Sequence, residues 1–197
     1  VDGISSYPVM KSNHSFDLLS CFPASAEPGK AFTSVTYSNL YFREPESRAD
    51  QTRMMSIVTT GAETGYYVDV FRSRKEKGGD KMHDYFYHNL GQTLTLTAAD
   101  GSDLNLQPTE ELAFAGAHLY AYSYLYDKKV AATNKDVKAT FTIDMKDKDG
   151  DDIYMNLWMK GEPDREVFTA LAPMTEGLSR TPNMPYNIKE QPTLTFV

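Results

Sequence analysis

The clearest pattern of hydrophobic and polar positions lies near the carboxy-terminal third of the chain. Apolar residues alternate with polar residues from Val137 to Met145, and a second alternating run extends from Ile153 to Met159. Between them, Asp149-Gly150 is a dipeptide that favours a tight hairpin turn. Because the side chains of a strand alternate between its two faces, these runs predict two half-buried strands joined as a β-hairpin.

Shorter runs rich in Thr, Val, Tyr and Phe occur along the rest of the chain, separated by Pro, Gly and Asp-Gly turn signals. They predict strands at residues 15–22, 32–42, 54–60, 93–97, 119–126 and 193–197, and a hairpin of two strands over 66–91. Residues 44–51 and 163–186 are predicted to be loops. The sequence therefore predicts an all-β fold, an antiparallel β-sandwich of roughly ten strands, in which residues 1–197 form a single domain.

The predicted hairpin over residues 66–91 carries the densest set of chemically active side chains. Asp69 lies in the middle of its first strand among apolar residues, and a charged, Gly-containing loop follows. Burying a carboxylate is costly unless the group is paired. We therefore expect Asp69 to form a structural ion pair, with His83, His88 or Arg72 as its partner.

Strand geometry limits what the second strand of this hairpin can do. If the strand is regular, His83 shares a face with Tyr85, whereas Asp84 shares the opposite face with His88. Metal ligands must converge on one ion, so this arrangement disfavours a site built from the two histidines. We predict that Asp69, His83, Asp84 and His88 form a structural polar cluster and hold no metal; a functional Asp84–His88 pair is the alternative.

Basic residues flank the Gly78-Gly79 loop of the same hairpin. Arg72, Arg74 and Lys75 form a local cationic group on an acidic chain. A guanidinium matches a carboxylate or sulfate in a bidentate manner, so these side chains are candidates for contact with an acidic sugar. The alternative is a solvated hairpin tip.

Tyrosines alternate with smaller residues over 119–126. Tyr120, Tyr122, Tyr124 and Tyr126 would share one face of a regular strand. Tyrosine combines an apolar ring with a polar hydroxyl, so such a row serves either as a sugar-stacking platform or as packing between sheets. We take Tyr120, Tyr122 and Tyr124 as candidate substrate-binding residues and leave the packing interpretation open.

Composition excludes several classes of protein. The formal net charge of −7 argues against general nucleic-acid binding. Cys21 is the only cysteine, so the chain cannot form an intrachain disulfide. No apolar run approaches the roughly 20 residues that a membrane-spanning helix requires.

The stretch over residues 66–91 resembles the heparinase II/III-like polysaccharide lyases, which include the oligoalginate lyases. Weaker similarities are the opening Val1-Asp2-Gly3 and the late strand at 191–197. The matching residues of the main stretch are Tyr67, Val68, Asp69, Val70, Phe71, Arg72, Gly78, Gly79, His83, Asp84, Tyr85 and His88.

The resemblance implies a parent enzyme, periplasmic or secreted, that cleaves uronic-acid polysaccharides such as alginate or glycosaminoglycans by β-elimination. In that family the catalytic Tyr lies in a helical domain, and the main His and the zinc ligands lie in an earlier β segment. Because this chain matches neither region, no catalytic residue, cofactor or zinc ligand is assigned here, and zinc is expected only in the upstream part of the parent.

The resemblance thus implies that this chain is the non-catalytic carboxy-terminal β-sandwich of a longer lyase, inactive when isolated. Its expected partners are an anionic polysaccharide or oligosaccharide and the upstream helical and β domains. Two alternatives stay open: a stand-alone carbohydrate-binding module and a purely structural sandwich.

Overall fold

The computed structural model describes residues 15–23, 34–44, 47–75, 77, 82–112, 121–145, 150–174 and 191–197. Over these ranges the chain is all-β, with antiparallel strands in three sheets and a short 3₁₀ helix, η1 (Ala121–Tyr124). The predicted all-β antiparallel class is confirmed. The chain divides into two compact units, whose described residues lie within 1–83 and 84–197. The expectation of a single domain stays a prediction.

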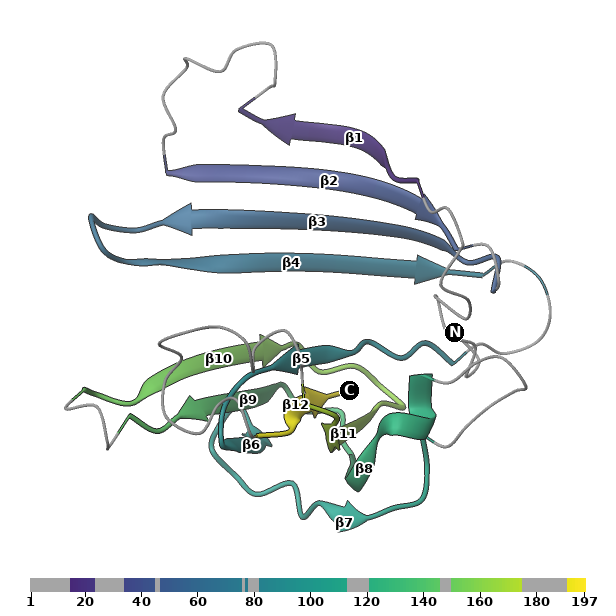
Figure 1. Cartoon of the computed structure of the whole chain (residues 1–197). Helices are drawn as coiled ribbons and strands as arrows, with labels where there is room; N and C mark the ends of the chain where they lie inside the picture. Colours follow the sequence, from purple (N-terminus) through teal and green to yellow (C-terminus); the bar gives the residue numbers. More distant parts are fainter. Residues whose placement is uncertain are drawn as a thin grey trace. The chain divides into compact units, whose positions relative to one another are not determined.

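The first unit is one four-stranded sheet in which each strand pairs with the next along the chain (Figure 1). A tight turn joins the last two strands, where the amides of Thr60 and Gly61 both donate to the Thr64 carbonyl. A β-bulge between Leu18 and Ser20 interrupts the pairing of the first strand. The four strands are β1 (Asp17–Phe22), β2 (Val35–Arg43), β3 (Asp50–Thr59) and β4 (Gly65–Arg74).

The second unit contains two sheets. The three-stranded sheet has the order β10 (Ile153–Met159), β9 (Val137–Ile143), β6 (Thr93–Ala98). The five-stranded sheet has the order β5 (Tyr87–Asn89), β12 (Thr193–Phe196), β11 (Glu166–Ala172), β8 (Tyr126–Ala132), β7 (Gln107–Pro108).

The two sheets of the second unit enclose one apolar core. Val137, Ala139 and Phe141 of β9 are buried together with Val167 of β11 and Phe196 of β12. Alternate residues of β9 point inward, as the sequence pattern predicts, and β9 pairs with β10 over its whole length. The second unit is therefore a β-sandwich, and the predicted hairpin of residues 137–159 is confirmed.

The predicted hairpin over residues 66–91 is wrong. Its first strand, β4, pairs with β3, whereas β5 pairs with β12 in another sheet. The short turn after β3 brings β4 alongside it at a small loss of chain entropy, and the pairing runs over ten residues of each strand. β4 is the last strand of its sheet, and only three residues of the later segment become strand, paired with β12.

Three other expectations need correction. Residues 121–124 form a 3₁₀ helix, not a strand, and β8 begins at Tyr126. Residues 166–172 of the predicted loop form β11, a central strand of its sheet. The predicted polar loop at 44–51 ends early, because Asp50 and Gln51 already pair with Arg74 and Ser73 in the β3–β4 ladder.

Candidate functional site

The cationic group predicted around the Gly78-Gly79 loop begins at the end of β4. Arg72 and Arg74 are exposed and lie on one face of the sheet, two residues apart. Asp50 of β3 lies opposite Arg74, so a carboxylate partly offsets this positive charge. Lys75 follows directly after the strand, whereas Gly78 and Gly79 lie outside the described residues.

Asp50 also stabilises the neighbouring Tyr41. The Tyr41 hydroxyl donates to Asp50 Oδ1 at 2.6 Å, and this hydrogen bond raises the pKa of Tyr41. Asp50 thus accepts a hydrogen bond from a phenol and lies opposite Arg74 in the ladder, so this end of the sheet carries charges of both signs.

Asp69 forms an ion pair with Arg53 of the adjacent strand β3. The Arg53 Nε donates to Asp69 Oδ1 at 3.0 Å, and Nη2 donates to Oδ2 at 2.6 Å, a bidentate arrangement. The sequence offered His83, His88 and Arg72 as partners and missed Arg53. Finding it requires the β3–β4 register. Arg53 pairs with Phe71, two residues along β4 from Asp69, so Arg53 and Asp69 are diagonal neighbours on one face.

Asp84 and His88 lie near each other in the second unit. The hydroxyl of the buried Tyr122 donates to Asp84 Oδ2 at 2.5 Å. The Phe86 ring packs between the Tyr122 and His88 rings, with centroid separations of 5.5 and 6.1 Å. His88 Nδ1 lies 2.9 Å from Thr195 Oγ1 of β12.

Burial affects the protonation of two groups in this cluster, the Tyr122 hydroxyl and the His88 imidazole. Burial and the hydrogen bond to Asp84 raise the pKa of Tyr122, and burial lowers the pKa of His88. Tyr122 thus keeps its proton and His88 is neutral near pH 7. Because the Tyr122 hydroxyl is enclosed and engaged, its contribution is to packing and orientation.

The other two residues of the predicted polar cluster, Asp69 and the exposed His83, belong to the first unit. The cluster of all four residues stays a prediction. Within the described ranges, no three His, Cys, Asp or Glu side chains lie close enough together to hold a metal ion.

The tyrosines do not form one row. Tyr122 is 5% exposed and points inward, whereas Tyr124 is 59% and Tyr126 48% exposed. The 3₁₀ helix turns residues 122 and 124 to different sides, which a regular strand would not do. Tyr120 lies outside the described residues.

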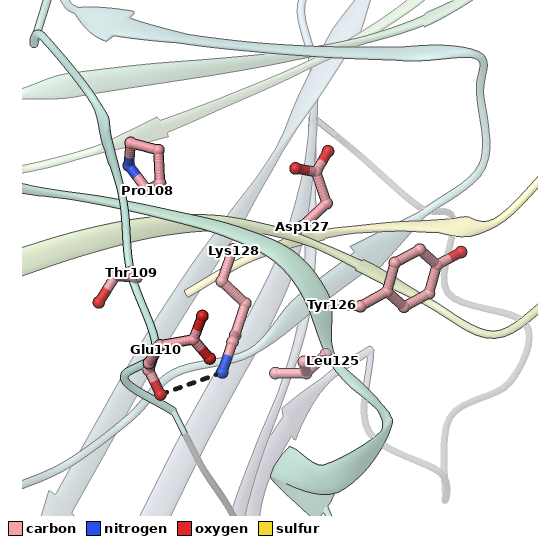
Figure 2. Close-up of a pocket in the computed structure, with 7 residues that line it drawn as sticks. All are labelled: Pro108, Thr109, Glu110, Leu125, Tyr126, Asp127 and Lys128. Carbon is pink, nitrogen blue, oxygen red and sulfur yellow. Dashed lines mark hydrogen bonds between the residues drawn. The ribbon is translucent and has the colours of Figure 1, made fainter.

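An open pocket of about 530 Å³ lies where β7 ends and β8 begins (Figure 2). The ammonium of Lys128 donates to the Glu110 carbonyl at 3.2 Å and closes one side. Tyr126 contributes an aromatic ring, and the two carboxylates are those of Asp127 in β8 and Glu110, two residues after β7. The lining residues are Pro108, Thr109, Glu110, Leu125, Tyr126, Asp127 and Lys128. Sequence reasoning missed this pocket because it depends on β7 lying beside β8.

Comparison with known proteins identifies one informative relative. An endo-acting ulvan lyase of Formosa agariphila is 32% identical over 143 residues, which is 71% of this chain. This chain is related to a polysaccharide lyase. The matched region is 17% of the relative's length. No family model and no solved structure matches the chain.

Among the described residues, no helix is both long and apolar enough to cross a membrane.

Proposed function

We propose that this chain is the non-catalytic β-sandwich portion of a polysaccharide lyase that cleaves uronic-acid-containing polysaccharides by β-elimination. The observation that carries the proposal is the 32% identity to an endo-acting ulvan lyase over 143 residues. The finer assignment to the heparinase II/III-like lyases rests on the similarity of residues 67–88. A periplasmic or secreted location, upstream helical and β domains, and zinc in those domains belong to the same proposal.

The side chains of the described residues support a role without chemistry of its own. β-Elimination requires a base for the proton beside the uronate carboxyl group and an acid for the leaving oxygen. Tyr122 is buried against Asp84, and Asp69 is engaged by Arg53. Tyr122 is enclosed, and the exposed Asp69 is held by Arg53 in a bidentate ion pair, which supports placing the base and the acid outside this chain.

The test compares the gene-encoded protein with the isolated chain of residues 1–197. Ulvan, alginate and heparin are supplied in turn, and unsaturated product is followed by its ultraviolet absorbance. The full protein should release product from at least one of them, and the isolated chain should release none. A full protein without activity on any uronic-acid polysaccharide would contradict the proposal.

A second candidate function is a stand-alone carbohydrate-binding module. The exposed rings of Tyr124 and Tyr126, beside the pocket of Figure 2, favour it. Gene-encoded length distinguishes the two: several hundred residues with a helical region upstream supports the lyase portion, and a length near 197 supports the module.

A further inference from the structure

Trp158 occupies an unusual environment. It is the only tryptophan of the chain, it lies near the end of β10, and it is 60% exposed. Tryptophan has a large apolar ring and is highly buried on average in folded proteins. A tryptophan on the outer face of a regular strand therefore points to a ligand.

The position of Trp158 is fixed by the register of the sheet. The neighbours Leu157 and Met159 pack against the core, so strand alternation turns Trp158 to the outer face. A slip of one residue would bring Trp158 inside and turn Leu157 outward. The seven consecutive pairs between β10 and β9 leave no such slip.

The register also defines what surrounds Trp158. We call the outward-facing residues of β10, β9 and β6 the outer face. Its rows, read across the three strands, are Tyr154–Thr142–Thr93, Asn156–Thr140–Thr95 and Trp158–Lys138–Thr97. Two aromatic rings, an amide, an ammonium and five threonine hydroxyl groups thus share one surface, which is the composition of a sugar-binding face.

The spacing of the two aromatic residues suits a linear glycan. Tyr154 and Trp158 are four residues apart in one strand, a separation of about 13 Å. Tyr154 is 58% exposed. Between them lies Asn156, whose Oδ1 accepts a hydrogen bond from Thr140 Oγ1 at 2.9 Å. Two stacking positions with a fixed amide between them fit a chain of linked sugar rings lying along β10.

The two ends of the outer face differ in charge. The Lys138 ammonium lies 5.1 Å from the Trp158 ring centroid, and the exposed Lys160 follows two residues after Trp158. At the other end, the Tyr154 hydroxyl donates to Asp152 Oδ2 at 3.3 Å. An acidic substituent of a sugar is therefore favoured at the Trp158 end and disfavoured at the Tyr154 end.

We propose that the outer face of β10, β9 and β6 binds an anionic polysaccharide. Trp158 and Tyr154 stack on sugar rings, Asn156 and the threonines bond to hydroxyl groups, and Lys138 with Lys160 pairs with a uronate or sulfate group. This inference rests on the proposed function, because the lyase relationship supplies the class of ligand. It adds a binding surface that does not use the cationic end of β4 or the tyrosines of residues 120–124.

The test uses the whole chain with ulvan, alginate and heparin as probes. Because Trp158 is the only tryptophan, its fluorescence reports the outer face alone. Polysaccharide should shift this emission. Affinities of the variants are measured by isothermal titration calorimetry, because replacing Trp158 removes the fluorophore, and Trp158→Ala should weaken binding by at least about tenfold. Trp158→Phe should retain part of the affinity, and Lys138→Ala should weaken the dependence of affinity on salt.

A matched control is Tyr67→Ala, which removes a ring that is 72% exposed on β4 of the first unit. Its affinity should equal that of the unmodified chain. Tyr124→Ala tests the surface of the second candidate function, and a loss of affinity in Tyr124→Ala with none in Trp158→Ala would overturn the inference. Since Trp158, Tyr67 and Tyr124 are exposed and Lys138 is half-buried, none of them lies in the core, and circular dichroism should show the same fold for every variant.

The outcomes separate this inference from the proposed function. Binding with unchanged fluorescence and no effect of Trp158→Ala would overturn the inference and leave the polysaccharide role intact. An unmodified chain that binds none of the three polysaccharides would also overturn it, while the product assay on the gene-encoded protein decides the lyase proposal. Self-association through Trp158 without polysaccharide binding would make the face an interface between copies, and would equally refute it.

Discussion

At the scale of single residues, a short hydrogen bond of the second unit joins the Tyr122 hydroxyl and the Asp84 carboxylate. Tyr122→Phe would remove the donor and leave the Asp84 carboxylate without this bond. We expect the free energy of unfolding to fall by about 1–3 kcal/mol, the cost of an unsatisfied, partly buried polar group. Urea denaturation measures the change.

The control for this substitution is Tyr154→Phe. Its hydroxyl contacts Asp152 at 3.3 Å on an exposed ring, so its loss should cost less than about 0.5 kcal/mol. Equal effects of the two substitutions would mean that the Tyr122–Asp84 hydrogen bond contributes no more to stability than the exposed Tyr154–Asp152 hydrogen bond.

His88 gives the second unit a pH dependence. Burial lowers the pKa of His88 in the folded chain, so the unfolded chain binds the proton first as the pH falls. This contribution to stability is complete above the unfolded pKa and decreases as the pH falls from about 7 to about 5. The variant His88→Gln should lose less stability over that interval. Parallel stability curves for the two proteins would contradict this role.

Glycine is required at the turn that leads into β6. Gly91 has a φ of +143°, and a Cβ atom there would lie 2.5 Å from the Thr142 carbonyl oxygen. Gly91→Ala should therefore lower stability by about 2–3 kcal/mol, since it adds a backbone clash to an unfavourable conformation. The comparison is Gly101, with a φ of +85° and open space around its Cβ position.

Gly101→Ala should cost only about 1 kcal/mol, the penalty of the left-handed conformation alone. Thermal unfolding of both variants, followed by far-ultraviolet circular dichroism, measures the difference. A Gly91→Ala chain as stable as the Gly101→Ala chain would show that the Thr142 carbonyl shifts at no cost.

At the scale of elements, the sequence pattern predicts those strands that have one face buried and the other exposed to solvent. Strands β9 and β10 alternate strictly and were predicted with their pairing. β11 was missed because its consecutive residues Val167 and Phe168 are both buried, so it shows no alternation. The tyrosine alternation at 120–126 predicted a strand, yet the inward hydrogen bond of Tyr122 accompanies a 3₁₀ turn.

Strand partners were harder to predict than strands. The sequence joined β4 to β5, although β4 pairs with β3 and β5 with β12. β5 pairs with a strand more than 100 residues later in the chain, and a local pattern carries no information on such distant partners. The Arg53 partner of Asp69 and the pocket of Figure 2 likewise depend on strand pairing and could not be found from the sequence. Alternation puts Trp158 and Leu157 on opposite faces of one strand, but which of the two faces is exposed required the structure.

At the scale of the whole molecule, the chain is acidic, and the aromatic and cationic side chains proposed to bind a polysaccharide occupy a small part of its surface. The net charge of −7 disfavours general attraction to polyanions, so affinity must come from stacking and a few local cations. The outer face offers Trp158, Tyr154, Lys138 and Lys160 together. A polysaccharide lyase gains from such a surface, because it keeps the polymer near the catalytic part of the enzyme.

The most direct test of this account is a titration of the isolated chain with ulvan, read for binding and for product in the same sample. Trp158 fluorescence reports binding, and ultraviolet absorbance reports unsaturated product. The predicted result is saturable binding with no gain in absorbance. Release of unsaturated product by residues 1–197 alone would contradict the central claim that this chain is a non-catalytic part of a lyase.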